Sequence, residues 1–259
     1  MFARERQNQL LRLLEQKGRL TAREIHEELG VSAATIRRDL AELAEQGRVV
    51  RTHGGVIHPA ALQGEPVFQQ RVRVATAAKQ ALAAQAVTHV PPSATIYIDS
   101  GTCALAVAQR LLARRDVTLL TPSIPLLMAG RADGARIIAT GGDLRVPSQS
   151  LIGSLALSWM NHLRFDIAFI GASGLAPREG ARVTSLEEAA MKQAAMARAG
   201  RVILVAEKGK WDKPAAILFS GWSGFHVWIT DKALSRAERQ AMAAPHLIVE
   251  TVGVKEREP

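Results

Sequence analysis

The sequence contains a single cysteine, Cys103, among 259 residues. One thiol cannot close a disulfide within the chain or supply a cysteine-based zinc site, so both kinds of stabilised fold are excluded. A reducing, cytoplasmic compartment fits this composition. Cys103 is interpreted as a small apolar filler in preference to a nucleophile, and we expect neither a metal nor a cofactor.

Long apolar runs are also missing. No stretch of about 18 uncharged apolar residues occurs, so no membrane-spanning helix is predicted. The charges of residues 1–6 are not followed by an apolar run, which is unlike a secretory signal. The chain has no internal repeat of solenoid period and no low-complexity tract. Its 47% hydrophobic residues allow a large core, and its length suits two domains.

Basic residues are in excess, with 33 Lys and Arg against 24 Asp and Glu and a net charge of +9. Such a balance indicates a polyanionic partner. Residues 1–57 hold 10 basic and 8 acidic residues, which leaves 23 and 16 for the rest of the chain. The excess therefore does not locate a nucleic-acid surface, and the pattern within the N-terminal region has to do so.

Residues 4–57 are predicted to form three helices and a hairpin. The first helix carries leucines at helical spacing and ends before a glycine. Thr21 and Glu24 form a capping box for the second helix. Residues 48–57 have the pattern of two short strands around a glycine-bearing turn. A helix, a tight turn, a helix and a hairpin in about 55 residues form the geometry that places a helix in the major groove of DNA.

Ser32 is a good N-cap for the third helix, in which Ile36 and Leu40 point inward. Its first turn therefore exposes Ala33 and Ala34, whose small side chains allow a close approach to base edges. The predicted DNA-contacting residues are Ser32, Ala33, Ala34, Thr35, Arg37, Arg38, Arg51, Thr52 and His53. The alternative is an ordinary three-helix packing element whose arginines only solvate its surface.

This region resembles the DeoR family of bacterial regulators. The matching stretch is Gly30–Leu40 (GVSAATIRRDL), followed by Gly47 and by Arg51–Val56 (RTHGGV). The combination of Thr-Ile-Arg-Arg-Asp-Leu with a trailing Arg-x-His-Gly-Gly is much more specific than a generic helix-turn-helix. The resemblance implies that the helix at 32–45 and a wing near 51–55 bind an operator.

Residues 58–66 lack periodicity and contain two prolines and a glycine, so they are the predicted linker. The predicted domains are thus 1–57 for DNA binding and 67–259 for effector sensing and oligomerisation. After a helical segment near 67–89, short apolar runs alternate with amphipathic ones, which indicates a mostly parallel sheet covered by helices on both faces. The predicted strands are 95–99, 117–120, 135–140, 166–171, 201–206, 226–230 and 247–251, and the predicted helices include 102–113, 153–163, 185–199 and 235–244.

Two turns of this α/β part suit an anion. Asp99, Ser100, Gly101, Thr102 and Cys103 lead from a strand into a helix, where hydroxyls and backbone N–H groups converge. Asp99 lies at a carboxyl strand end, where open parallel sheets bind ligands. Gly141 and Gly142 form a second glycine turn at a strand end. Tight turns also use glycine and serine for purely structural reasons, and that interpretation stays open for both loops.

The resemblance to the DeoR family extends over nearly the whole chain. Its effector domain carries an Asp-Ser-Gly-Thr-Thr loop, a Thr-Asn-Ser segment, a Gly-Gly turn, a Phe-Asp-x-Ala-Phe-x-Gly strand and a late lysine. The matching segments here are 99–103, 121–123, 141–142 and 165–174, followed by 187–192 (EEAAMK) and 206–211. The resemblance implies a fold like that of ribose phosphate isomerases, a phosphorylated sugar or polyol as effector, and a homo-oligomer, dimer or tetramer. It adds Thr121, Ser123, Asp166 and Lys210 to the effector-binding residues.

Three positions depart from the family pattern. Cys103 stands where the family has Thr, which removes a hydroxyl donor to a phosphate. Pro122 stands in place of Asn and removes an amide and a backbone N–H. Glu207 stands where Asp is usual. Lys210 is interpreted as a charge partner of the effector, the alternative being a solvated surface lysine.

The sequence therefore predicts a DNA-binding transcriptional regulator, with repression favoured over activation, of carbohydrate-metabolism genes. One alternative is a sugar-phosphate isomerase on the same scaffold, with Asp99 or Asp166 as base and Lys210 as electrostatic stabiliser. The attached DNA module argues against this enzyme. A second alternative is a protein-interaction role for the N-terminal helices, which would show weaker salt dependence than binding to duplex DNA.

Overall fold

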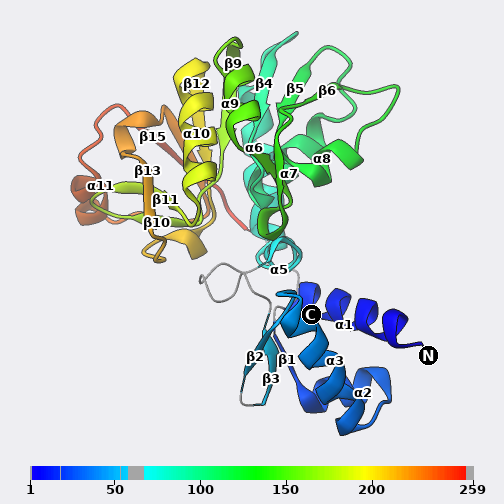
Figure 1. Cartoon of the computed structure of the whole chain (residues 1–259). Coiled ribbons are helices and arrows are strands. Elements are labelled where there is room, and N and C mark those ends of the chain that lie inside the picture. The colour runs from blue at the N-terminus through cyan, green and yellow to red at the C-terminus, as the bar shows by residue number, and fades with distance from the viewer. Residues whose placement is uncertain (1, 18, 53, 58–66, 255–259) are drawn as a thin grey trace. The chain divides into compact units, whose positions relative to one another are not determined.

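The computed structural model describes residues 2–17, 19–52, 54–57 and 67–254. The chain forms two compact units, Met1–Val74 and Ala75–Pro259 (Figure 1). The predicted linker at 58–66 lies outside the described residues. Within the described residues, no helix combines the length and apolar character needed to cross a bilayer.

The first unit is a winged helix-turn-helix. Its elements are α1 (Ala3–Lys17), β1 (Arg19–Thr21), α2 (Ala22–Leu29), α3 (Ala33–Glu45), β2 (Val50–Thr52), β3 (Gly55–Ile57) and α5 (Phe68–Arg73). The predicted three helices and hairpin are confirmed. The prediction missed β1, which pairs with β3 and makes the wing a three-stranded antiparallel sheet in the order β1-β3-β2. With three residues, β1 is too short to show a strand periodicity.

Leucine and isoleucine side chains from α1, α2 and α3 form one hydrophobic core. Its buried members are Leu10, Leu11, Leu14, Leu20, Ile25, Leu29, Ile36, Leu40, Leu43, Val49 and Val56. The wing is anchored in this core through Val56 and Leu20, which are partners in the β1–β3 register. The arrangement fixes the hairpin against the helices, because both strands contribute a buried side chain.

The helix predicted near 67–89 is broken in the structure. The break falls between α5 and α6 (Thr76–Ala86), where Ala75 has a left-handed φ of 53° that a continuous helix does not allow. α5 packs against α1, and the first compact unit therefore extends to Val74. The predicted sensor boundary at residue 67 lies eight residues before the structural one at Ala75, because the sequence pattern does not show which core α5 joins.

The second unit is built on a parallel sheet of seven strands, all of which the sequence predicted. They are β4 (Thr95–Ile98), β5 (Thr118–Thr121), β6 (Arg136–Ala139), β9 (Phe165–Ile170), β12 (Ala199–Val205), β14 (Val227–Thr230) and β15 (Ile248–Thr251). Their order in the sheet is β15-β14-β12-β9-β4-β5-β6. The predicted α/β fold with a mostly parallel sheet is confirmed.

Helices cover this sheet. They are α6, α7 (Thr102–Leu111), α8 (Ile124–Met128), α9 (Ser154–Met160), α10 (Leu186–Arg198) and α11 (Arg236–Met242). Figure 1 shows α10, in yellow, running along β9 and β12, with which it is in contact. The sequence did not predict α8, which has only five residues, the second of which is a proline.

Two small antiparallel sheets were not predicted. One pairs β7 (Asp143–Arg145) with β8 (Ser150–Ile152). The other contains β10 (Gly174–Ala176), β11 (Gly180–Val183) and β13 (Ile217–Ser220) in the order β10-β11-β13. Each of these strands has only three or four residues, and β11 pairs with β13 from 34 or more residues away, so local periodicity does not reveal them.

Strand order locates the functional edge of the sheet. From β4 the chain builds outward through β5 to β6, and it then returns to β9 on the other side of β4. The crevice at such a reversal, beyond the carboxyl ends of the strands, is where open α/β sheets bind ligands. Asp99 follows β4 and Gly171 follows β9, so these two residues meet at the reversal point.

Two adjacent glycines of the wing offer a matched test of its packing. A Cβ atom on Gly55 would lie 2.0 Å from the Leu20 carbonyl oxygen, whereas one on Gly54 meets nothing within 4 Å. We expect Gly55→Ala to lower the free energy of unfolding of the first unit by about 1–3 kcal/mol, because the added methyl separates β1 from β3. Gly54→Ala should change it by no more than about 0.5 kcal/mol.

The measurement is urea denaturation followed by far-UV circular dichroism. All four tryptophans lie in the second unit, so their fluorescence reports that unit alone and should be unchanged in both variants. Equal stability of the two alanine variants would show that β1 is not packed as the structure has it.

Candidate nucleic-acid interface and effector site

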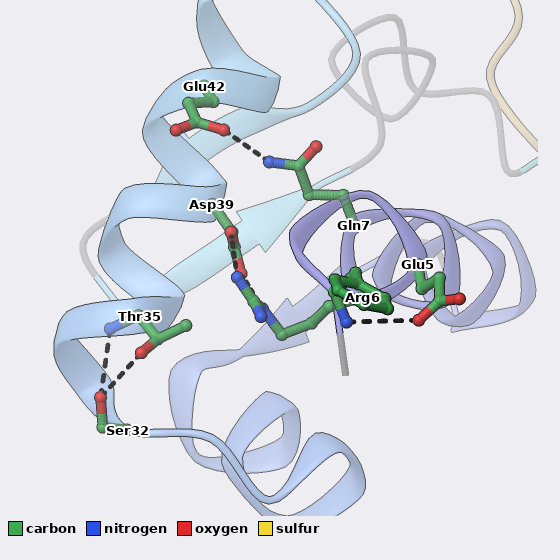
Figure 2. A network of polar contacts seen from close by, with 8 residues as sticks. Glu5, Arg6, Gln7, Ser32, Thr35, Asp39 and Glu42 are labelled. Carbon is green, nitrogen blue, oxygen red and sulfur yellow. Dashed lines mark hydrogen bonds and ion pairs between the residues drawn. The ribbon is translucent and has the colours of Figure 1, made fainter.

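The N-terminal turn of α3 presents a polar, sterically small surface. Ser32 is the N-cap, and its Oγ accepts a hydrogen bond from the Thr35 backbone N–H at 3.3 Å (Figure 2). The Ser32 and Thr35 hydroxyls also lie 2.9 Å apart. Ala33 and Ala34 are exposed beside them. The helix therefore begins with two small residues that leave its backbone accessible to a DNA base edge.

Two arginines continue this surface along α3. Arg37 and Arg38 are both exposed, whereas Ile36 and Leu40 are buried in the core. The placement agrees with the sequence prediction for each of these residues. Arg51 and Thr52 are likewise exposed on β2, and His53, the third predicted residue of the wing, lies outside the described residues. The exposed guanidinium groups are available to phosphates or to guanine.

The turn between α2 and α3 is stabilised by local contacts. Gly30 ends α2 in the left-handed conformation with a φ of 64°, which lets the chain reverse without strain. The capping box of Thr21 and Glu24 is present in full. Beyond it, the His26 Nδ1 atom lies 2.8 Å from the Val31 carbonyl oxygen. The capping box stabilises the start of α2, and the Gly30 conformation with the His26–Val31 contact stabilises the turn that leads into α3.

A buried ion pair holds α3 from its opposite side. The Arg6 guanidinium of α1 binds the Asp39 carboxylate through two atoms, Nε to Oδ2 at 2.5 Å and Nη2 to Oδ1 at 2.9 Å (Figure 2). Asp39 is 2% exposed. One turn further along, Gln7 donates to Glu42 at 2.6 Å. Neither contact was predicted, because residues 33 or more positions apart in the chain leave no local signature of their contact.

At the sheet edge of the second unit, Asp99 makes two contacts. Its Oδ2 accepts a hydrogen bond from the Gly171 N–H at 2.9 Å and forms an ion pair with Lys192 of α10. Asp99 and Lys192 are both buried, and the ammonium also faces the Phe219 ring. The carboxylate thus joins β4, β9 and α10 at the reversal point of the sheet.

A second carboxylate, Glu207, follows β12 at the same edge. The Cys103 thiol donates a hydrogen bond to its Oε2 at 2.9 Å, and the Lys210 ammonium lies 3.6 Å from its Oε1. Burial raises the pKa of Glu207. Lys210, the Cys103 thiol and Lys79 of α6 lower it, and together they outweigh burial, so the pKa lies below its ordinary value. Burial, aided by Glu207, raises the pKa of Cys103 well above its ordinary value. At neutral pH Glu207 is therefore charged and Cys103 is a protonated donor.

A third buried carboxylate, Glu188, stands one helical turn before Lys192 on α10. It pairs with Arg145 of β7, whose Nη1 lies 3.5 Å from its Oε1. Arg145 also donates to the Ser148 hydroxyl at 3.1 Å. The unpredicted β7–β8 hairpin is thereby linked to the helix that carries Lys192.

The predicted effector residues differ in where the structure places them. Ser100, Gly101, Thr102 and Cys103 form the first turn of α7 and its N-cap beside Asp99, as expected. Thr121 and Ser123 are buried but locally engaged, since the Thr121 hydroxyl donates to the Ile98 carbonyl at 2.7 Å and accepts from the Ser123 N–H at 3.0 Å. They support the edge of β5, which agrees with the structural role that such residues often have.

The second glycine turn follows β6, which is two strands away from β4 in the sheet. Gly142 has a φ of 105° and packs closely against the Ile152 carbonyl, so its glycine is required by the base of the β7–β8 hairpin. Gly141 lines a separate apolar hollow of about 390 Å³ with Leu120 and Trp159 among its walls. The structural interpretation accounts for Gly142, and effector binding by this turn stays a prediction.

The position of Asp166 does not agree with its predicted role in effector binding. This residue occupies the second position of β9, and its carboxylate accepts the Thr95 N–H at 2.7 Å, near the amino ends of the strands. A side chain at the start of a parallel strand is on the opposite edge of the sheet from Asp99, so Asp166 does not take part in the cluster. Lys79, Arg145, Glu188 and Lys192 are all buried or nearly so, and none of them was among the predicted site residues. For Lys79, Glu188 and Lys192 the available signal was a charged residue on an otherwise apolar helix face, whereas Arg145 lies on strand β7.

A winged helix-turn-helix followed by a parallel α/β unit with charged groups gathered at its reversal point defines a regulator with a DNA-binding unit and a sensor unit. Two family models match the chain, the DeoR-like helix-turn-helix domain over residues 6–60 and the DeoR C terminal sensor domain over residues 74–232. The chain belongs to the DeoR family of transcriptional regulators. Membership of this family overturns the isomerase alternative.

Curated relatives match along nearly their full length. The uncharacterized HTH-type transcriptional regulator YgbI of Escherichia coli is 31% identical, over 95% of this chain and 97% of its own. The glycerol-3-phosphate regulon repressor of the same organism is 29% identical over 95% and 98%. Among solved structures, ribose 5-phosphate isomerase from Plasmodium falciparum has a TM-score of 0.38 and 16% identity, over 51% of this chain and 52% of its own. We draw nothing from a likeness at that score.

The Arg6–Asp39 pair yields a test of how α3 is held. We expect Asp39→Asn to lower the free energy of unfolding of the first unit by about 2–4 kcal/mol, because it leaves the Arg6 charge without its carboxylate partner. The control is Glu45→Gln, the same chemical change at an exposed position of the same helix, for which we expect a change within about 0.5 kcal/mol. Chemical denaturation followed by circular dichroism measures both, and equal effects would contradict the positioning role of Asp39.

Proposed function

We propose that this protein is a repressor of carbohydrate- or polyol-phosphate-metabolism genes, which acts as a homo-oligomer in the cytoplasm and is released from its operator by a phosphorylated sugar or polyol. The observation that carries the proposal is the pairing of an exposed Ala-Ala-Thr-x-Arg-Arg surface on α3 with a buried cluster of lysines and carboxylates at the switch point of the second unit. The 29% identity to a glycerol-3-phosphate regulon repressor supports the class of regulated genes.

The DNA-binding half of the proposal rests on the division of α3 into two faces. One face is buried and held by Arg6, and the other exposes Ala33, Ala34, Arg37 and Arg38. The small residues allow α3 to approach the bases, and the arginines supply charge-assisted bonds to phosphate or guanine. Arg51 and Thr52 of the wing contact the adjacent backbone in this proposal. Operators for such units are two-fold symmetric, which is the reason to propose an oligomer.

The sensor half rests on the start of α7. The turn formed by Ser100–Cys103 offers backbone N–H groups and a helix N-terminus to an anion. Lys210 and Lys79 both act on Glu207 beside this turn, so two ammonium groups stand within electrostatic range of the same point. A phosphate placed there replaces Glu207 as their partner. The residues we assign to effector binding are therefore Asp99, the turn of α7, Lys79 and Lys210.

Coupling follows from the position of Lys79 in the chain. Lys79 belongs to α6, the first helix of the second unit, which begins directly after the unit boundary at Val74. An effector that draws Lys79 away from Glu207 favours a different placement of α6 relative to the sheet. We propose that the effector thereby shifts the population toward an arrangement in which the paired DNA-binding units no longer match the spacing of the operator half-sites.

The first test concerns DNA. A duplex is selected from a random-sequence pool with the wild-type protein, and binding is measured over a range of salt concentrations. We expect Arg37→Ala with Arg38→Ala to lower affinity by about 100-fold or more and to reduce the slope of log K against log salt by about 1–2, because fewer counterions are released. The control is Arg131→Ala with Arg136→Ala, which removes the same charge from exposed positions of the second unit. Unaltered binding by the Arg37 and Arg38 variant would refute the assignment of α3.

The second test concerns the effector. Full-length protein is screened by thermal shift against inorganic phosphate, glycerol 3-phosphate and ribose 5-phosphate, since a ligand of the native state raises its melting temperature. We expect Lys210→Met to weaken binding of the active compound by about 10-fold or more, the scale of one charge-assisted hydrogen bond. Lys208→Met, at an exposed position two residues away, should bind as the wild type does. The active compound must also weaken operator binding at fixed salt, or the proposed release is wrong.

A further inference from the structure

The Tyr97 hydroxyl is a buried polar group with no hydrogen-bond partner among the described residues. Tyr97 is the third residue of β4 and is 0% exposed, with its ring 5.5 Å from that of Phe165. Buried tyrosine hydroxyls usually find a partner, because a donor removed from water and left without one destabilises the fold. Phenylalanine would fill the same space at no such cost, so the hydroxyl calls for a partner other than the residues that the structure describes.

The place of Tyr97 in the strand connects it with the effector cluster. The Asp99 N–H still bonds to the Phe169 carbonyl at 3.1 Å, so the strand geometry continues to Asp99. Residues two apart in a strand project from the same face of the sheet. Tyr97 therefore lies one side-chain layer below Asp99 on the face that Asp99 shares with Lys192 of α10.

Glu188 stands near the same hydroxyl. Glu188 and Lys192 are four residues apart on α10 and project from one side of the helix. Burial, Asp99 and Glu188, in that order, raise the pKa of Tyr97 well above its ordinary value. The phenol is thus a protonated donor at neutral pH. The two nearby carboxylates already hold Lys192 and Arg145 as partners.

Asp99 and Lys192 pair at the carboxyl edge of the sheet, and Tyr97 is the next residue inward on the same face of β4. A ligand whose oxygens exchanged partners with this ion pair would bring its remaining polar groups toward the Tyr97 hydroxyl. Lys192 and Arg145 supply donors, and Asp99 and Glu188 supply acceptors. Hydroxyl groups both donate and accept, so the chemistry that matches this mixed set is a carbon chain bearing several hydroxyls.

We propose that Tyr97 is a specificity-determining residue of the effector site, whose hydroxyl donates to an oxygen on the carbon chain of the ligand while the phosphate binds at the start of α7. This inference rests on the proposed sensing of a phosphorylated sugar or polyol. Tyr97 distinguishes such a ligand from inorganic phosphate, which occupies only the α7 end of the site.

Tyr97 is the one tyrosine of the sequence, which makes a direct experiment possible. Full-length protein labelled with 13C at the tyrosine Cζ gives a single resonance that responds to hydrogen bonding of the attached hydroxyl. It is recorded alone and with saturating inorganic phosphate, glycerol 3-phosphate or ribose 5-phosphate. We expect a sugar or polyol phosphate to move the resonance and inorganic phosphate to leave it in place.

The companion variant is Tyr97→Phe, which removes only the oxygen. We expect its affinity for the active compound, measured by calorimetry, to fall about five- to tenfold, the effect of one lost hydrogen bond. Its affinity for inorganic phosphate and its melting temperature without ligand should not fall, because no described residue is a hydrogen-bond partner of the hydroxyl. A loss of melting temperature would instead indicate a structural role.

The outcomes separate the two proposals. If a sugar or polyol phosphate binds the wild type and Tyr97→Phe equally, and the Cζ resonance does not move, the assignment of Tyr97 is wrong and the proposed function stands. If none of the three compounds raises the melting temperature of the wild type, the proposed effector class and the assignment of Tyr97 both fail.

Discussion

The ion pair between Asp99 and Lys192 is the constraint on which the second unit depends. Both groups are buried, so neither is tolerated there without the other. The pair fixes α10 against the carboxyl end of β4, and the hydrogen bond from Gly171 ties the same carboxylate to β9. The point where the sheet reverses its direction of growth is thereby held by charge and not by apolar packing alone. Charge is also what a polar ligand needs there.

In both units a buried ion pair fixes the position of a helix, but the charged side chains around the pair differ in their exposure. In the first unit, Asp39 forms an ion pair with Arg6 on one face of α3, and Arg37 and Arg38 are exposed on the opposite face. In the second unit, the charged side chains at the reversal point of the sheet are buried or nearly so and pair with one another. An exposed cationic face suits a polymer of phosphates, whereas an enclosed set of paired charges suits a small ligand that must compete with those pairs for its place.

Sequence reasoning predicted the parts of this protein whose signals are local. All seven strands of the parallel sheet were found because each is a short apolar run at a regular distance from an amphipathic helix. The exposure of Ala33, Ala34 and Arg37 followed from the buried positions of Ile36 and Leu40. Asp99 was predicted from its motif, but its pairing with Lys192 was not, since the two residues are 93 positions apart in the chain. Asp166 was assigned to the site through the family resemblance, although the predicted strand 166–171 begins with it and so already placed it at the amino end of β9.

Cys103 and Glu207 show how two departures from the family pattern compensate each other. Exchange of Thr for Cys removes a hydroxyl from the first turn of α7, and exchange of Asp for Glu lengthens the facing carboxylate by one methylene. In the structure the longer side chain reaches the thiol, and the Sγ–Oε2 distance is 2.9 Å. The pair keeps the turn and β12 in contact but withdraws the side chain of residue 103 from an incoming anion. In the proposed effector site, recognition of a phosphate is then left to the backbone N–H groups of the turn and to Lys79 and Lys210. These groups are indifferent to what the phosphate is attached to, so selection among phosphorylated compounds must come from the groups that meet the carbon chain.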